Sequence, residues 1–283
     1  MSITPPDPET AKGFSAVDAQ PDPSFLVAGM EATAEWPAVI QLRDFERATL
    51  SPTPGDRVLD VGCGIADVAR GYAALVSPGG RVVGIDASEA MLAVARHRAA
   101  ADGVDAEFRV GDALAIDESD GSFDVVRSER MLQWLPDLQA GFDELVRVLA
   151  APGRLCVADT DWRTLTVDLS DTEAADALLA ALVAYRGASS AAGGRLLNLC
   201  RAAGLIDVRH ASAAHVWDQW DPDLAPAPSG LFPLASVSTD LVGMGLLTQD
   251  LADRFVEGIT TAGRDGRFWM SVTMTTVVAR RPG

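Results

Sequence analysis

Lysine is almost absent from this chain of 283 residues: Lys12 is the only one, and arginine supplies nearly all the positive charge. The 23 basic residues face 40 acidic ones, which gives a formal net charge of −17 at pH 7. Nucleic-acid phosphates are bound by clustered lysines and arginines, so this balance argues against a nucleic-acid partner.

Cysteine is also scarce. Cys63, Cys156 and Cys200 are widely spaced and form no Cys-x-x-Cys or Cys/His cluster, so no zinc site is predicted and reduced thiols are expected. No apolar run approaches the roughly 18–20 residues of a membrane span, and residues 1–13 lack the apolar core of a signal peptide. We therefore expect a cytoplasmic protein with neither a metal nor a membrane partner.

Two familiar phosphate-binding motifs are missing as well. No Gly-Lys-Ser/Thr occurs, which excludes a P-loop, and a Gly-x-Gly-x-x-Gly fingerprint starting at Gly62 fails at Asp67. What residues 57–76 do contain is an apolar run, a Gly62-Cys63-Gly64 break and then apolar residues at helical spacing. This order predicts the strand, glycine turn and helix at which open α/β sheets bind nucleotides.

Asp60-x-Gly62-x-Gly64 resembles motif I of the class I S-adenosylmethionine-dependent methyltransferases. Four later segments resemble the second to fifth strands of that family in the correct order, namely 81–86, 107–113, 123–129 and 153–158. The branch that looks most similar contains small-molecule methyltransferases related to quinone-biosynthesis enzymes. Ala66 replaces the usual third glycine, and we expect it to be tolerated because the helical period suggests that it is already helical.

The resemblance implies an α/β fold: a Rossmann-like seven-stranded sheet with helices on both faces, an antiparallel last strand and a helical lid. Residues 1–50 are expected to form a flexible arm and N-terminal lid helices, and 51–165 the cofactor-binding core. Residues 166–283 are expected to complete the sheet, with an insertion at about 218–267 that covers the acceptor. The box Ser170-x-x-Glu173 predicts a helix start.

The implied cofactor is S-adenosylmethionine, with S-adenosylhomocysteine as product. By the same resemblance Asp86 holds the ribose, Asp112 and Ala113 the adenine, and Glu129 lies near the methyl group. Arg43 is assigned to the cofactor carboxylate, with a solvated helix arginine as the alternative, while Met91 either touches adenine or packs in the core. The full implied set is Arg43, Asp60, Gly62, Cys63, Gly64, Asp86, Ala87, Met91, Asp112, Ala113, Ser128 and Glu129.

No catalytic base stands at the expected place. Several relatives that methylate hydroxyls carry a histidine just past the fourth strand, and Gln133 occupies that position here. An amide orients a substrate but cannot accept its proton. The acceptor is therefore a carbon nucleophile or an amine, or ionises readily, or a base comes from Glu129, Asp161 or His215. Asp159 and Asp161 lack a third ligand that would make them a metal site.

We expect methyl transfer to a small molecule, at oxygen, within specialised metabolism. Trp134, Trp162, Trp217, Trp220 and Trp269 favour a largely apolar or aromatic acceptor. Methylation at carbon, a cofactor-binding protein that has lost transfer, and a non-catalytic binding module are the alternatives. The sequence leaves the oligomeric state open.

Overall fold

A computed structural model describes residues 14, 17–19 and 22–283 of the chain. Its sheet has seven strands in the order β3-β2-β1-β4-β5-β7-β6, and β7 is antiparallel to both of its neighbours. The strands are β1 (Arg57–Val61), β2 (Arg81–Asp86), β3 (Glu107–Val110), β4 (Phe123–Glu129), β5 (Leu149–Val167), β6 (Ile206–Trp217) and β7 (Met270–Arg281). The predicted fold class, including the antiparallel last strand, is confirmed.

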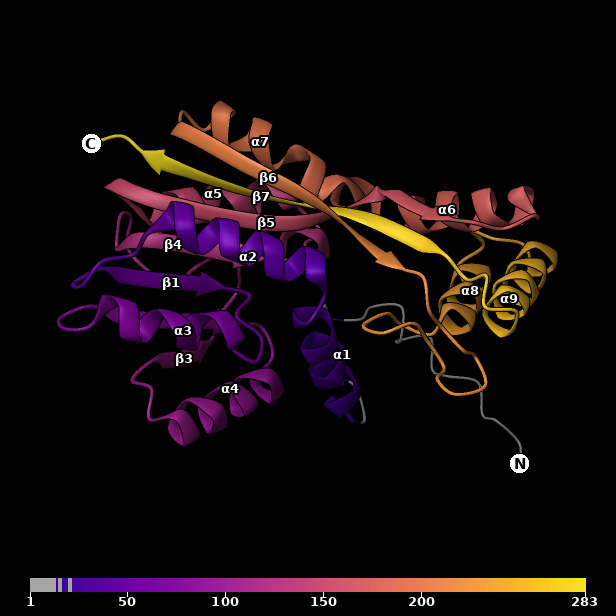
Figure 1. The fold of residues 1–283 in the computed structure, drawn as a ribbon. Coiled ribbons are helices and arrows are strands. Elements are labelled where there is room, and N and C mark those ends of the chain that lie inside the picture. Colours follow the sequence, from indigo (N-terminus) through magenta and orange to yellow (C-terminus); the bar gives the residue numbers. More distant parts are fainter. Residues whose placement is uncertain (1–13, 15–16, 20–21) are drawn as a thin grey trace.

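Helices cover both faces of the sheet (Figure 1). They are α1 (Ser24–Ala34), α2 (Pro37–Leu50), α3 (Asp67–Val76), α4 (Glu89–Asp102), α5 (Leu138–Val148), α6 (Thr172–Arg186), α7 (Ala192–Ala202), α8 (Leu234–Gly243) and α9 (Gln249–Arg264). Two short 3-10 helices are η2 (Leu132–Trp134) and η3 (Gly187–Ala191).

The apolar residues of β1 are explained by burial on both sides of the strand. Leu59 packs in the cluster formed with α5 and α7, whereas its neighbour Val58 packs in the cluster formed with α3 and α4. Val277 and Val278 of β7 divide between the same two clusters. Successive strand residues point to opposite faces, so a strand covered by helices on both faces has no polar side to show.

Strand β5 is much longer than the predicted strand at 153–158. It continues to Val167 because β7 pairs with it first along Gly153–Asp161 and again at Thr166 and Val167. Strands β5, β6 and β7 thereby extend beyond the parallel part of the sheet towards α8 and α9 (Figure 1). This extension has its own apolar cluster, which includes Leu178 of α6, Leu241 of α8 and Phe255 of α9.

Two local expectations were wrong. Asp171, not Ser170, caps α6, because its carboxylate accepts the backbone N–H of Ala174 at 3.1 Å and also binds Arg254. Ala66 is not in a right-handed helical conformation: it precedes α3 with φ 60° and ψ 30°, in the left-handed region. The position therefore keeps a backbone conformation that glycine adopts most easily. Helix α8 had no counterpart among the expected elements.

Part of the predicted flexible arm packs on the folded core. Residues 1–13, 15, 16, 20 and 21 lie outside the described residues, but Phe14 stacks edge-on against Trp134 at 5.6 Å and Val17 is 5% exposed. Asp18 accepts a hydrogen bond from the backbone N–H of Glu89. The apolar side chains of Phe14 and Val17 therefore anchor this otherwise polar segment on the core.

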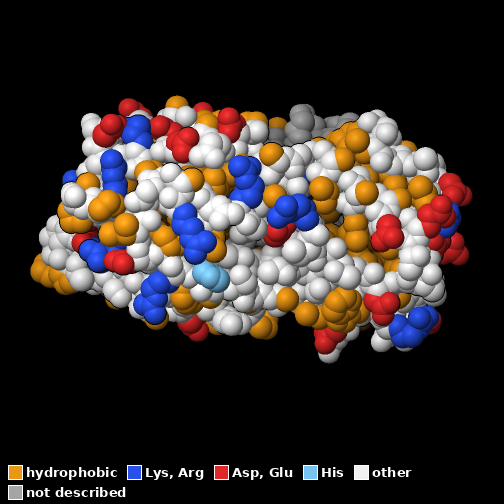
Figure 2. All heavy atoms as spheres, turned by 90° about the horizontal axis from the view of Figure 1, so that it is seen from above, with side chains coloured by type: hydrophobic (Ala, Val, Ile, Leu, Met, Phe, Trp, Pro, Cys, Tyr) orange, Lys and Arg blue, Asp and Glu red, His pale blue; other side chains and the backbone are white. Residues whose placement is uncertain are grey.

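The outer surface is mixed in character. On the face shown in Figure 2, arginine side chains are interspersed with acidic and hydrophobic ones. Among the helices of the described part of the chain, none has the length and apolar content needed to cross a membrane.

Candidate functional site

The glycine turn after β1 is shaped by two residues with positive φ. Gly62 has φ 74° and Gly64 has φ 52°, and a Cβ at Gly62 would come within 2.5 Å of the Met131 side chain. A Cβ at Gly64 would meet the end of Met30. Gly64 donates its N–H to Asp86 Oδ2 at 2.8 Å, which fixes the turn against the end of β2.

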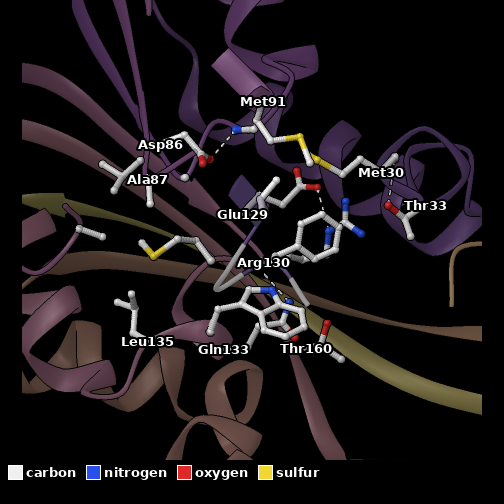
Figure 3. Close-up of a pocket in the computed structure, with 18 of the residues that line it drawn as sticks. Met30, Thr33, Asp86, Ala87, Met91, Glu129, Arg130, Gln133, Leu135 and Thr160 are labelled. Carbon is white, nitrogen blue, oxygen red and sulfur yellow. Dashed lines mark hydrogen bonds and ion pairs between the residues drawn. The ribbon is translucent and has the colours of Figure 1, made fainter. Parts of the chain in front are cut away.

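A cavity of about 330 Å³ opens beside this turn, at the carboxyl ends of the parallel strands. In Figure 3, Asp86, Ala87 and Met91 lie at one end, and Gln133 and Thr160 lie at the other. Further walls come from Phe14, Met30, Thr33, Trp36, Met131, Trp134, Leu135, Trp162, Arg186, Leu231 and Phe232. The cavity therefore runs from the glycine turn to a largely apolar region roofed by α1 and by residues 230–232.

Eight of the twelve residues assigned to the cofactor line this cavity. They are Gly62, Gly64, Asp86, Ala87, Met91, Asp112, Ala113 and Glu129. Both carboxylate oxygens of Asp86 accept backbone N–H groups, from Gly64 at 2.8 Å and Ser88 at 2.9 Å. Burial raises the pKa of Asp86, and these N–H groups counteract it. Asp112 Oδ1 accepts the N–H of Leu114 at 2.8 Å.

The other four residues lie away from the cavity wall: Arg43, Asp60, Cys63 and Ser128. Cys63 packs in the core, and burial raises its pKa. Ser128 donates its hydroxyl to the backbone oxygen of Val61 at 2.9 Å, which ties β4 to β1. Arg43 does not reach into the cavity. Its guanidinium donates two hydrogen bonds to the Glu129 carboxylate, at 2.9 and 2.8 Å.

Asp60 belongs to a buried ion cluster beneath the glycine turn. The Arg127 guanidinium, 3% exposed, donates to Glu46 at 2.7 Å, to Asp60 at 2.8 Å and to Glu129 at 3.1 Å. Arg43 and Arg130 also pair with Glu129, so three arginines face three carboxylates. Burial raises the pKa of Asp60 to about 6 although Arg127 opposes the shift.

Glu129 is the centre of that cluster rather than a candidate base. Burial alone would raise its pKa, but Arg43, Arg130 and Arg127 outweigh burial and hold the pKa below its usual value. A carboxylate held in its ionised form by three cations is a poor proton acceptor at neutral pH.

Gln133 lies at the far end of the cavity with both ends of its amide engaged. Its Nε2 donates to the backbone oxygen of Arg130 at 3.1 Å, and its Oε1 accepts from the indole N–H of Trp162. The orientation of the amide is fixed by these partners, since a carbonyl only accepts and an indole N–H only donates. Its backbone N–H binds Asp159 Oδ2 at 3.1 Å, so Gln133 holds Trp162 in the cavity wall.

The structure does not bring His215 or Asp161 to the cavity. His215 stacks on Trp36 with ring centroids 4.0 Å apart, and burial lowers its pKa to about 4. Asp161 is held by Arg163 at 2.8 and 2.7 Å. Of the five tryptophans proposed as pocket walls, Trp134 and Trp162 line the cavity, whereas Trp217, Trp220 and Trp269 do not. Among the described residues, no three or more His, Cys, Asp or Glu side chains are arranged so that they could hold a metal ion.

Sequence reasoning missed two cavity residues of consequence, Trp36 and Arg186. Trp36 stands directly before Pro37, at the break between two helices, and that position gave no hint that its ring turns inward. Arg186 ends α6 just before Gly187, where a basic residue is ordinary on grounds of the helix dipole. Only the packing of distant segments reveals either one.

Comparison with known proteins agrees with this geometry. Residues 52–202, more than half of the chain, match the model of a family described as a methyltransferase domain. The chain therefore belongs to this methyltransferase family.

Two curated relatives illustrate the similarity. A demethylmenaquinone methyltransferase of Thermus thermophilus is 40% identical over 103 residues, which are 36% of this chain and 46% of the relative. Nocamycin O-methyltransferase of Saccharothrix syringae is 34% identical over 175 residues, 56% of this chain and 62% of the relative. The chain thus spans less than two thirds of the length of either relative.

A solved structure shares the fold over most of its length. The YcgJ protein of Bacillus subtilis has a TM-score of 0.58 at 18% identity, with 86% of this chain and 99% of that chain covered. At this identity the match concerns the fold alone.

Proposed function

We propose that the protein transfers the methyl group of S-adenosylmethionine to a small, largely apolar or aromatic molecule, at an oxygen atom. One observation carries the proposal: a single cavity joins the glycine turn and Asp86 to a region walled by Trp134, Trp162 and Phe232. Donor and acceptor must meet for direct transfer, and a continuous cavity with two chemically distinct ends provides for both.

The donor end has the groups that this cofactor needs. The turn at Gly62 and Gly64 has positive φ at both glycines and brings backbone to the cavity wall, and Asp86 offers carboxylate lone pairs to ribose hydroxyls. Asp112, Ala113 and Met91 line the same cavity, and we assign the adenine ring to them. When bound, S-adenosylmethionine supplies an electrophilic methyl group and leaves as S-adenosylhomocysteine.

The chain's own residues contribute orientation rather than proton transfer. Gln133 holds the Trp162 ring, and the aromatic walls exclude water from the acceptor. Well-oriented reactants gain roughly 7–11 kcal/mol over the same reaction in solution, so orientation can supply much of the rate. None of Glu129, Asp161 and His215 combines a place in the cavity with a pKa suited to a base.

The choice of oxygen is supported by the relative named nocamycin O-methyltransferase, which has the longer match of the two relatives described above. The demethylmenaquinone relative supports a ring-containing acceptor. Methylation at carbon stays the alternative, and a role in specialised metabolism and a cytoplasmic location stay predictions.

A second candidate is a protein that binds the cofactor without transferring its methyl group. The [4+2]-cyclase SpnF shares the fold, with a TM-score of 0.51 at 19% identity and 87% of this chain covered, so the fold does not decide the reaction. The test incubates full-length protein with S-adenosylmethionine and candidate aromatic acceptors and measures S-adenosylhomocysteine together with methylated product. Tight cofactor binding without any S-adenosylhomocysteine across the acceptors favours the second candidate.

A further inference from the structure

Arg186 lines the cavity at the end that is walled by Trp134 and Trp162. Its guanidinium carbon lies 4.6 Å from the ring centre of Trp134 and 4.3 Å from that of Trp162, so it is held between two indole rings. The Nε and Nη1 atoms are shielded from solvent, and neither has a hydrogen-bond partner in the part of the chain that the structure describes.

The positive charge of Arg186 is only partly compensated by its surroundings. The cation–π contacts with the two indole rings and the C-terminus of α6 both favour a cation at this position. Burial lowers the pKa of Arg186 to about 10, so the side chain stays protonated at neutral pH. A buried cation is normally paired with an anion, because the loss of hydration is large.

Asp159 does not serve as that anion at close range. Its Oδ2 accepts the backbone N–H of Gln133 at 3.1 Å and its Oδ1 accepts that of Thr160 at 2.8 Å. It attracts Arg186 through space, but no ion pair joins the two side chains. Arg130, which also lines the cavity, differs in having Glu129 as its partner.

We propose that Arg186 binds an anionic oxygen group of the acceptor, either a carboxylate or an ionised enol, while Trp134 and Trp162 pack against its apolar part. The proposal rests on the proposed function, because it treats the ligand of this end of the cavity as the acceptor. Charge-assisted hydrogen bonds from a guanidinium to an oxyanion are among the strongest in proteins. The acceptor class thereby narrows from apolar or aromatic molecules to apolar or aromatic acids.

This assignment also accounts for the missing base. The sequence left three explanations for the presence of Gln133 in place of a histidine. The Arg186 cation favours one of them, namely an acceptor that is ionised at neutral pH. When the methyl group is transferred to the anionic oxygen itself, no proton has to be removed at the site, and a nearby arginine favours the ionised form of that oxygen.

The test compares charged and neutral probes of the same shape. Calorimetry measures binding of 1-naphthoate and 1-naphthamide to the full-length protein saturated with S-adenosylhomocysteine. We expect wild type to bind 1-naphthoate at least about tenfold more tightly, since hydrogen bonds to charged groups correspond to ten- to hundredfold in affinity. A third probe, 2-hydroxy-1,4-naphthoquinone, is ionised at neutral pH and separates an acidic enol from a carboxylate.

Variants assign the preference to one residue. Arg186→Met should bind the two probes with affinities within about twofold of each other, and Arg186→Lys should keep part of the preference. Arg163→Met is the matched control, because Arg163 is already paired with Asp161 and does not line the cavity. It should behave as wild type.

Three results would overturn the proposal. The first is equal affinity of wild type for the charged and neutral probes, or no binding of 1-naphthoate at concentrations up to about 10 mM. The second is a charge preference that survives in Arg186→Met. The third is a loss of S-adenosylhomocysteine affinity in Arg186→Met, which would assign the cation to the cofactor.

A stability measurement keeps the test informative if binding is weak. Arg186→Met removes a charge that has no ion pair among the described residues, so its Tm without probes should stay close to that of wild type. A purely structural role predicts a clear fall in Tm. Failure of the proposed function looks different: acceptors yield no S-adenosylhomocysteine although the charge preference for probes persists.

Discussion

Arg127 is buried and Arg186 is half-buried, and the protein surrounds the two guanidinium groups in opposite ways. Arg127 lies beneath the glycine turn and donates to Glu46, Asp60 and Glu129 within 3.3 Å. Arg186 lies between two indole rings, and its Nε and Nη1 have no partner among the described residues. The first arginine is satisfied by the fold, and the second has capacity left for a ligand.

The contrast separates the cavity into two functional ends. Beneath the glycine turn the charges of the ion cluster are balanced within the protein, because three arginines pair with three carboxylates. At the acceptor end a positive charge is left over. Residues that hold the fold should therefore affect stability first, and residues that face the ligand should affect binding first.

The largest expected effect is that of Arg127→Met on stability. This change leaves Glu46, Asp60 and Glu129 buried without their shared partner, and breaking a buried ion pair by removing one side costs about 3–5 kcal/mol. Urea denaturation of the full chain measures the loss, with Arg186→Met as the comparison at less than about 1 kcal/mol. Equal losses in the two variants would contradict the distinction between a satisfied and an unsatisfied arginine.

Asp86→Ala should have the next largest effect, on cofactor affinity. Asp86 lines the cavity and keeps carboxylate lone pairs free beyond the two backbone N–H groups that it accepts. Loss of charge-assisted hydrogen bonds to ribose costs roughly 1.5–3 kcal/mol, so binding of S-adenosylmethionine should weaken about ten- to hundredfold.

Calorimetry with the cofactor checks this value, and Asp124→Ala is the control because Asp124 pairs with Arg57 and lies outside the cavity. Asp86→Ala also tests the comparison of the two ends of the cavity, because it should not change the preference for 1-naphthoate over 1-naphthamide. Unchanged cofactor affinity in a folded Asp86→Ala protein would remove the ribose assignment.

Asp112→Ala should weaken cofactor binding less than Asp86→Ala does. Asp112 lines the cavity, but one of its oxygens is engaged by the N–H of Leu114, and a single hydrogen bond to the adenine amine is at stake. We expect a loss of about three- to tenfold, in line with about 1 kcal/mol for one hydrogen bond. A loss greater than that of Asp86→Ala would reverse the ranking of the two acids.

Local sequence predicted the strands and the glycine turn beside the cavity well, because their backbone geometry follows from short-range rules. Strands β2 and β4 have the bounds expected from their apolar runs, and the two glycines of the turn have the positive φ that a tight turn requires. The acceptor end depends on contacts between segments far apart in the sequence. Trp134, Trp162 and Arg186 come from η2, β5 and α6, and no period or motif in any of these elements indicates that they meet.

The ion cluster was hidden for the same reason. Arg43 and Glu129 are 86 residues apart, so a sequence motif that assigned Arg43 to the cofactor could not show that Glu129 engages it first. Glu129 also pairs with Arg127 and Arg130. The long β5 was missed because its second half depends on β7, more than 100 residues later.

The smallest expected effect is on the pH dependence of the rate, and it follows from the protonation of Asp159. Burial raises the pKa of Asp159 to about 7, against the two backbone N–H groups that favour its ionised form, while Arg130 and Arg186 add weaker attraction. The folded state thus binds this proton more tightly than the unfolded chain, whose aspartate has a pKa of about 3.9. Stability should fall as pH rises from about 4 to about 7, and Asp159→Asn should remove that part of the dependence.

Ionised Asp159 also binds the backbone N–H of Gln133 more strongly, which holds the Gln133–Trp162 pair in place. The rate of methyl transfer to a single acceptor should therefore rise only about two- to threefold from pH 6 to pH 8, a difference of roughly 0.5 kcal/mol in the barrier. Asp159→Asn should flatten the profile. Gln133→Ala should lower the rate at every pH without adding a new limb.

His215→Gln and Glu129→Gln are the decisive comparisons for that profile. Through pH 6–8 His215 stays neutral because burial lowers its pKa to about 4, and Glu129 stays ionised because three arginines lower its pKa. Neither group should shape the pH dependence of the rate. If the pH dependence of the rate persists in Asp159→Asn but disappears in His215→Gln or Glu129→Gln, the residue concerned is a catalytic base. That result would contradict the interpretation that the acceptor arrives already ionised.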